Sequence, residues 1–155
     1  MQRLKETSGK IMGVDFGDKR TGLAVSDKTR FLASGIGQIS VGGMYKTAAR
    51  IAEIIKEENI TGGIVIGLPV NMNGSHGPRA EHAEKFAGIL EGILKEDEAT
   101  ASLPIVMLDE RMTTMAASRY LNETDTRGQK RKQVIDTLSA EIILQNALDR
   151  LKNMA

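Results

Sequence analysis

Three carboxylates in this chain lie where an acidic side chain needs a partner. Asp15 ends one apolar run, Glu110 closely follows another, and Asp136 falls on the apolar face of a helical pattern. Burying a carboxylate alone is costly, and carboxylate oxygens are the ligands that Mg²⁺ and Mn²⁺ favour. Together the three could hold divalent metal.

Asp15 is placed at the closed end of a predicted hairpin. Residues 11–17 have the pattern of a short strand, residues 17–20 of a turn, and residues 21–26 of a second strand. Gly17 can adopt a positive φ and leaves open space that suits the close approach of a phosphate. The structural alternative is that Asp15 caps its own turn, which is a common role of aspartate.

Glu110 follows a continuous apolar run at residues 104–108, which has the length of a strand covered on both faces. Side chains alternate along a strand, so Asp109 and Glu110 cannot easily face the same site, and one of them is structural. The alternative is that both are solvated and that Arg111 balances their charge. A short helix to about residue 121 is expected next.

Asp136 lies in a predicted final helix over residues 133–151, which contains no Gly or Pro. At 3.6 residues per turn it shares a face with Ala140, Ile143 and Ala147. An acidic residue in a first turn also interacts favourably with the helix dipole, by about 0.3 to 1 kcal/mol. The dipole interaction does not require Asp136 to lie on the apolar face of the helix. A bound cation or another binding partner therefore explains its position on that face better.

Composition limits the possible functions. The chain has 155 residues, 3% aromatic residues, no Cys and a net charge of +1. The length suits one domain, and the absence of Cys excludes disulfides and thiolate chemistry and fits a reducing cytosol. No apolar segment approaches the ~20 residues that span a bilayer, and the first ten residues lack the core of a signal peptide. We expect a cytoplasmic protein whose nucleic-acid contacts, if any, come from local basic clusters rather than aromatic stacking.

The remaining pattern completes an α/β chain. A third strand is expected near residues 32–41, a helix at 45–58, a buried strand at 63–67 and a helix at 79–95. Three strands in hairpin succession, followed by alternating helices and strands, predict a mixed five-stranded sheet with helices on both faces.

Two segments are candidates for substrate contact. The loop over residues 68–79 is long, is rich in Gly and Asn, and leaves a buried strand where open sheets bind ligands, although it could be only a mobile connection. The basic run at residues 127–132 precedes Asp136 and could neutralise phosphates, although such runs are more often solvated loops. The expected substrate-binding residues are Lys19, Arg20, Asn71, Asn73, Arg111, Lys130, Arg131 and Lys132. Neither His76 nor His82 has a partner at triad or zinc spacing, so we expect both to be solvated.

Four motifs in this order resemble the YqgF family of ribonuclease H-like, Holliday-junction-resolvase-like proteins. The motifs are GVDFGDKRTGLAVSD at residues 13–27, GLPVNMNGS at 67–75, DERMTT at 109–114 and DTLSA at 136–140. The resemblance implies a ribonuclease H-like domain over residues 9–155, preceded by an extension at residues 1–8 that we expect to be disordered. It also implies a site of Asp15, Glu110 and Asp136 that binds Mg²⁺ or Mn²⁺.

The family resemblance further implies a metal-dependent endonuclease that processes the 5′ end of pre-16S ribosomal RNA, with ribosomal particles as possible partners. Two metal ions would activate a water and stabilise the attacking and leaving oxygens of a phosphodiester. The alternatives are a Holliday junction resolvase and a non-catalytic ribosome-assembly factor that binds nucleic acid. A third is an actin-like ATPase, whose first phosphate motif the hairpin also resembles, although two such domains would be needed. The protein is expected to be a monomer or a homodimer, and symmetric cleavage of a junction would require the dimer.

Overall fold

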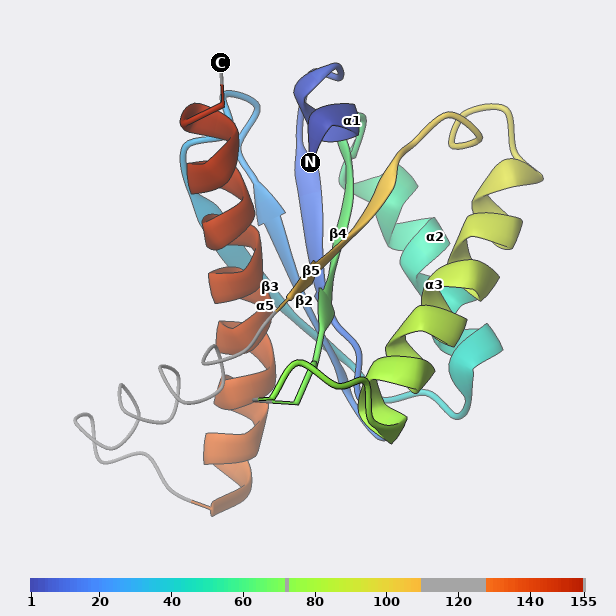
Figure 1. Ribbon diagram of the computed structural model, residues 1–155. Coiled ribbons are helices and arrows are strands. Elements are labelled where there is room, and N and C mark those ends of the chain that lie inside the picture. Colours follow the sequence, from blue (N-terminus) through green and yellow to red (C-terminus); the bar gives the residue numbers. More distant parts are fainter. Residues whose placement is uncertain (72, 110–127, 155) are drawn as a thin grey trace.

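The sheet of this protein is mixed and five-stranded, as predicted. The computed structural model describes residues 1–71, 73–109 and 128–154, with side chains from residue 137 onward in the last range. The strands lie in the order β3-β2-β1-β4-β5 (Figure 1). The two hairpin pairs are antiparallel, and β1, β4 and β5 are parallel. The strands are β1 (Ile11–Asp15), β2 (Thr21–Ser26), β3 (Ala33–Ile39), β4 (Gly63–Leu68) and β5 (Ile105–Asp109).

Helices cover both faces of the sheet, which also confirms the prediction (Figure 1). One face packs on α2 (Met44–Glu57) and α3 (Pro78–Lys95), and the other packs on α5 (Gly128–Lys152) and the short α1 (Gln2–Lys5). The alternation of side chains along each strand produces this division. In β1, for example, Met12 and Val14 join the core under α2 and α3, whereas Ile11 joins the core under α5.

The three parallel strands end together. Val14 of β1 is opposite Ile66 of β4, and Leu68 of β4 is opposite Asp109 of β5. We call the end of the sheet where β1, β4 and β5 finish the carboxyl edge. Both α3 and α5 begin at this same end, one on each side of the sheet (Figure 1). Open α/β sheets bind ligands at this edge, so the fold predicts a ligand-binding site there.

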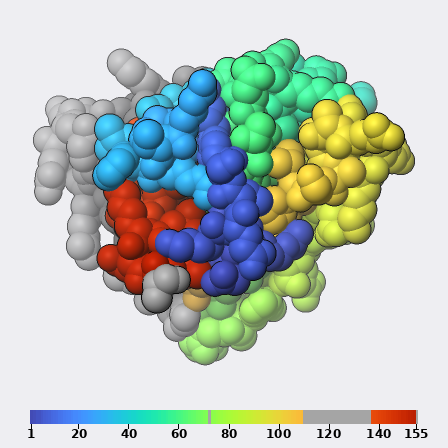
Figure 2. Space-filling model, turned by 90° about the horizontal axis from the view of Figure 1, so that it is seen from above, coloured from blue at the N-terminus to red at the C-terminus, as the bar shows by residue number. Residues whose placement is uncertain are grey.

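The extension at residues 1–8 packs on the domain, contrary to our expectation. Leu4 in α1 is fully buried in the core beneath α5. Arg30 donates hydrogen bonds to the Gly9 and Leu4 carbonyls at 2.8 and 2.7 Å, and the Thr7 hydroxyl donates to the Gly62 carbonyl at 2.6 Å. Figure 2 shows this segment across the end of the molecule away from the carboxyl edge, beside the end of α5. The buried leucine and these long-range hydrogen bonds hold the extension on the domain, and no local sequence pattern reveals such contacts.

The last helix also differs from the prediction. It begins at Gly128 rather than near residue 133, so residues 130–132 lie in its first turns and not in a loop. Its polar side binds the edge strand: Gln145 accepts a hydrogen bond from the Ala33 amide at 2.9 Å and donates one to the Phe31 carbonyl at 3.0 Å. The helix expected to end near residue 121 lies outside the described residues. No helix among the described residues combines the length and apolar character needed to cross a membrane.

Candidate functional site at the carboxyl edge

Asp15 is the last residue of β1 and is half-buried. It points to the same side of the sheet as Gly13, because residues two apart on a strand share a face. That side is covered by α5 at very short range. A Cβ built on Gly13 would lie 2.7 Å from the Leu144 Cβ and 3.0 Å from the Ala140 carbonyl oxygen. The missing side chain of Gly13 therefore lets α5 lie directly on β1, beside Asp15.

The register of α5 against β1 places residue 136 near Asp15. Asp15 lies two strand residues, or about 6.6 Å, beyond Gly13 toward the end where α5 begins. A helix rises about 1.5 Å per residue, so this advance corresponds to about four residues of α5. Counting back from Ala140, which contacts the Gly13 position, leads to position 136. The Asp136 side chain itself lies outside the described residues, but its backbone is part of α5.

The end of β5 brings a further carboxylate to the edge. Val106 and Leu108 face α5, whereas Ile105 and Met107 face the core under α2 and α3. Continued alternation turns Asp109, which is exposed, away from the face that carries Asp15. Glu110 and Arg111 come next in the sequence and lie outside the described residues.

The donors at this edge fit a hard divalent cation. A half-buried carboxylate at the end of β1 offers oxygen ligands, which Mg²⁺ and Mn²⁺ accept. Within the part of the chain that the structure describes, no group of three acidic, His or Cys side chains is close enough to hold a metal ion. Two of the three expected ligands, Glu110 and the Asp136 side chain, fall outside that part.

The turn that follows Asp15 is tight for a different reason from the one we expected. Gly17 is not among the glycines with positive φ, so the left-handed conformation is not what it supplies. A Cβ on Gly17 would lie 2.4 Å from the Arg20 carbonyl oxygen, so glycine is needed because the backbone folds back on itself. In this turn, which follows Asp15 in the chain, Lys19 is exposed and Arg20 is half-buried.

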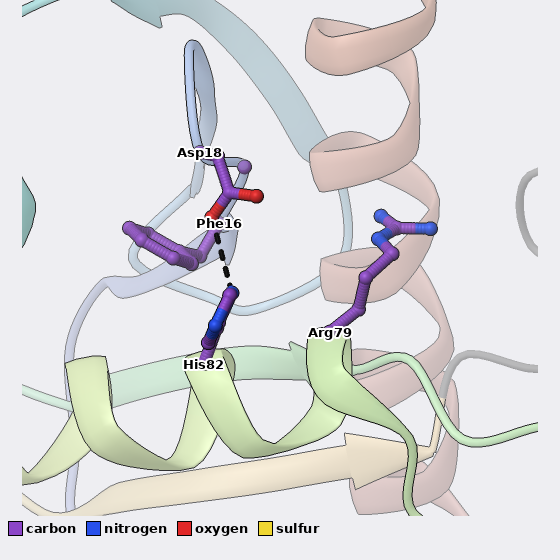
Figure 3. Close-up of a pocket in the computed structure, with 5 residues that line it drawn as sticks. Phe16, Asp18, Arg79 and His82 are labelled. Carbon is purple, nitrogen blue, oxygen red and sulfur yellow. Dashed lines mark ion pairs between the residues drawn. The ribbon is translucent and has the colours of Figure 1, made fainter.

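A small hollow adjoins this turn on the α3 side. Its lining comes from Phe16, Gly17 and Asp18 in the turn and from Arg79 and His82 on α3 (Figure 3). His82 Nδ1 lies 3.2 Å from an Asp18 carboxylate oxygen, so an ion pair links α3 to the turn when His82 is protonated (Figure 3). The sequence does not reveal this pair, because the partners are far apart in the chain and follow no spacing rule.

The second histidine is paired as well. His76 Nδ1 lies 2.8 Å from a Glu84 carboxylate oxygen, and this contact ties the loop before α3 to the helix. Both histidines are about half-exposed, at 49% for His76 and 46% for His82. The expectation of purely solvated histidines was therefore wrong in one respect: each has a carboxylate partner.

The loop between β4 and α3 is organised by its own asparagines. The Asn71 side chain donates to the Ser75 hydroxyl at 3.0 Å, and the Asn73 side chain accepts from the Ser75 amide at 3.0 Å. The Asn71 amide also donates to the Ser75 carbonyl at 2.9 Å, and Gly74 adopts a φ of +87°. Both asparagines are exposed, so they hold the loop in shape while facing outward at the carboxyl edge.

Comparisons with known proteins agree with this architecture. A family model described as RuvX, Holliday junction resolvase, matches residues 9–150. A protein of Pelotomaculum thermopropionicum named "Putative pre-16S rRNA nuclease" is 46% identical over 141 residues, which cover 90% of this chain and 86% of that protein. A Bacillus subtilis protein of the same name is 43% identical over 145 residues, covering 92% of this chain and 99% of that protein.

Solved structures resemble the chain in fold. The Thermus thermophilus protein in "T. thermophilus RuvC in complex with Holliday junction substrate" matches with a TM-score of 0.58 and 13% identity, covering 95% of this chain and 98% of that one. A second structure of that protein matches with a TM-score of 0.56 and 14% identity, over 93% of this chain and 96% of that chain. At such low identity the likeness concerns the arrangement of strands and helices, and it confirms the ribonuclease H-like fold class.

Proposed function

Because this chain belongs to the RuvX family of Holliday junction resolvases, we propose that it is a nuclease that hydrolyses phosphodiester bonds in pre-16S ribosomal RNA processing. Relatives at 41% to 46% identity, matched over nearly their whole length, are named as nucleases of this precursor. The substrate is a nucleic acid in both functions named for the family: precursor RNA in ribosomal RNA processing, or branched DNA in junction resolution.

One observation about the fold carries the proposal. Gly13 lets α5 lie on β1, so the helix that bears Asp136 begins at the carboxyl edge where Asp15 ends its strand. The parallel strand β5 delivers its final residues to the same edge. This convergence of β1, β5 and α5 at one end of the sheet supports a site made of Asp15, Glu110 and Asp136.

Asp15, Glu110 and Asp136 are proposed to hold Mg²⁺ or Mn²⁺ there. When bound, such ions supply Lewis-acid activation of a water and offset the negative charge that develops on the phosphodiester. The half-buried position of Asp15 keeps its carboxylate less hydrated than a surface group, which favours an oxygen ligand that faces a cation. No His, Ser or Cys nucleophile is required.

The proposed substrate contacts lie around this edge. Lys19 and Arg20 are in the turn after Asp15, and Asn71 and Asn73 are in the loop after β4. Lys130, Arg131 and Lys132 are in the first turns of α5, and Arg111 follows Glu110. The positive charges of the lysines and arginines would neutralise phosphates and, since no aromatic readout accompanies them, would not select a sequence.

Cleavage assays on two substrates test the proposal. The purified protein, with Mg²⁺ or Mn²⁺, should cut an RNA that spans the mature 5′ end of 16S ribosomal RNA. Asp15→Asn keeps the shape of the side chain but removes its charge, so cleavage should fall at least about 100-fold while affinity changes little. Asp109→Asn is the matched control, since alternation turns that side chain away, and it should lose much less activity.

The results of these assays distinguish three functions: RNA cleavage, junction resolution and RNA binding without cleavage. Cleavage of a four-way DNA junction in preference to the RNA, by a homodimer, would assign the protein to junction resolution, because symmetric cuts need two sites. If the wild-type protein cuts neither substrate but binds RNA, it is an assembly factor and the nuclease proposal is wrong. A separate readout is thermal stability: Mn²⁺ at 100 times its Kd should stabilise the wild type by about 2.7 kcal/mol and Asp15→Asn much less.

A further inference from the structure

Arg79 stands out at the carboxyl edge because no ion pair in the described part of the chain accounts for it. It lies in the first turn of α3, is exposed, and lines the hollow beside the turn that follows Asp15. Its guanidinium group extends from α3 to the level of the turn that bears Asp18 (Figure 3). Over the described ranges, 1–71, 73–109 and 128–154, no carboxylate pairs with it, although the neighbouring His82 has one.

The position of Arg79 works against the stability of its own helix. The first turn of a helix carries the positive end of the dipole, so a cation there is unfavourable and an acidic residue is favoured. The same turn contains Glu81, which is the residue type that suits this end. An arginine at an unfavourable position, with no carboxylate partner among the residues that the structure describes, is best explained by a ligand that it binds.

The surroundings of Arg79 suit an extended anion rather than a small one. The hollow is small, and the paired Asp18 and His82 form part of its wall. The Arg79 side chain rises from α3 apart from that pair (Figure 3). The Asp18 carboxylate opposes a compact anion inside the hollow, whereas a backbone that crosses the edge can reach Arg79 without entering it.

Cationic residues are present in the helices on both sides of the sheet at the carboxyl edge. The helices α3 and α5 begin on opposite sides of the sheet at this end (Figure 1). The first turn of α3 contains Arg79, the first turns of α5 contain residues 130–132, and Asp15 ends β1 in the sheet between the two helices. A nucleic-acid strand that crosses the edge would therefore meet cations on both sides of the proposed cleavage position. The planar guanidinium binds phosphate oxygens with two parallel hydrogen bonds, which fixes direction as well as charge.

We propose that Arg79 binds a backbone phosphate of the nucleic-acid substrate on the α3 side of the carboxyl edge, so that the strand is held across Asp15 from both faces of the sheet. This assignment rests on the proposed nuclease function. It adds a binding residue on the face opposite to α5, outside the motif stretches at residues 13–27, 67–75, 109–114 and 136–140. The Asp18–His82 pair joins the turn after β1 to the helix that carries Arg79.

The test measures binding without cleavage. Arg79→Ala, made in the Asp15→Asn background, is titrated with the labelled 16S 5′-end RNA between 50 and 200 mM salt. Loss of one phosphate contact should reduce the slope of log Kobs against log salt by about 0.7 to 0.9, which weakens binding about five- to eightfold at 0.1 M salt. Arg79→Lys keeps a positive charge, so it should retain most of the slope but lose part of the affinity.

Lys85→Ala is the matched control, because Lys85 is an exposed cation on the same helix and lies outside the hollow. It should leave the slope unchanged. Thermal unfolding of Arg79→Ala should show a Tm equal to or above that of its parent, since the charge opposes the dipole. An unchanged slope in Arg79→Ala, an equal effect from Lys85→Ala, or a clear loss of Tm would each overturn the assignment.

These results are distinguishable from failure of the nuclease proposal. If the wild type cleaves RNA and Arg79→Ala binds normally, only the Arg79 assignment is wrong. If the wild type cleaves nothing but Arg79→Ala still lowers the salt slope, the phosphate contact stands and only the nuclease function fails.

Discussion

Gly13→Ala is the perturbation that tests how closely α5 lies on β1. The added methyl group would lie 2.7 Å from the Leu144 Cβ, and ordinary van der Waals contact begins at 3.4 Å. The strand and the helix must therefore separate by about 0.7 Å. Both neighbours are main-chain or Cβ atoms, so no rotamer change can relieve the contact.

The magnitude follows from this overpacking. Extra methyl groups in a well-packed core cost about 1 to 3 kcal/mol, which in a chain of this size lowers Tm by about 2 to 12 °C. The displacement also moves the helix that bears Asp136 relative to Asp15. Since a misplacement of about 1 Å in an active site can cost about 100-fold in rate, cleavage by Gly13→Ala should fall about 10- to 100-fold even where the protein is fully folded.

Thermal unfolding and single-turnover cleavage of the 16S 5′-end RNA, both below the Tm of the variant, measure the two effects. Gly88→Ala is the control, because a Cβ there meets no atom within 4 Å and Gly88 lies inside α3. It should raise stability by about 0.5 to 1 kcal/mol and leave cleavage unchanged. If Gly13→Ala retains both wild-type Tm and wild-type cleavage, the reasoning about the β1–α5 contact is refuted.

Three further predictions concern other parts of the chain. Leu4→Ala should cost about 2 to 5 kcal/mol in urea unfolding, since Leu4 is fully buried, whereas a loss near zero would mean that the extension does not pack. The Thr29 hydroxyl and then backbone amides lower the pKa of Asp27 to about 2, so its charge stabilises the fold above the unfolded value of 3.8 and this contribution disappears as pH falls toward 2. The Tm difference between wild type and Asp27→Asn should therefore close between pH 4 and pH 2, and a constant gap would contradict the reasoning. Replacing residues 130–132 with Ala should reduce the salt slope of RNA binding by about 0.7 to 0.9 per lost contact, and an unchanged slope would exclude them from the interface.

The features that the sequence predicts correctly come from local signals. Apolar runs and helical periodicity come from neighbouring residues, and they identified the five strands, their mixed arrangement and the helices on both faces. The order of motifs indicated the family, and the position of Asp15 at the end of β1 was correct. The loop asparagines, Asn71 and Asn73, were identified as a feature of the carboxyl edge, although their contacts within the loop were not.

Some local expectations failed because a distant contact decided the outcome. The extension at residues 1–8 has no apolar periodicity, yet Leu4 is buried and Arg30 binds its carbonyl. The last helix was expected from residue 133, but helical backbone extends back to Gly128. A stripe marks where a helix packs and not where its hydrogen bonds begin.

The sequence by itself determined which residues could do chemistry and on which kind of element each lies, because residue type and periodicity are properties of the chain. Tertiary structure alone decided how they meet. The close approach at Gly13 brings α5 beside Asp15, and the pair of Asp18 with His82 joins two elements that no spacing rule connects. The position of Arg79, beside the turn after β1 and with no carboxylate partner among the described residues, became visible only when its neighbours were known. Packing distances and ion pairs depend on the register between elements, and a one-dimensional pattern contains no information about that register.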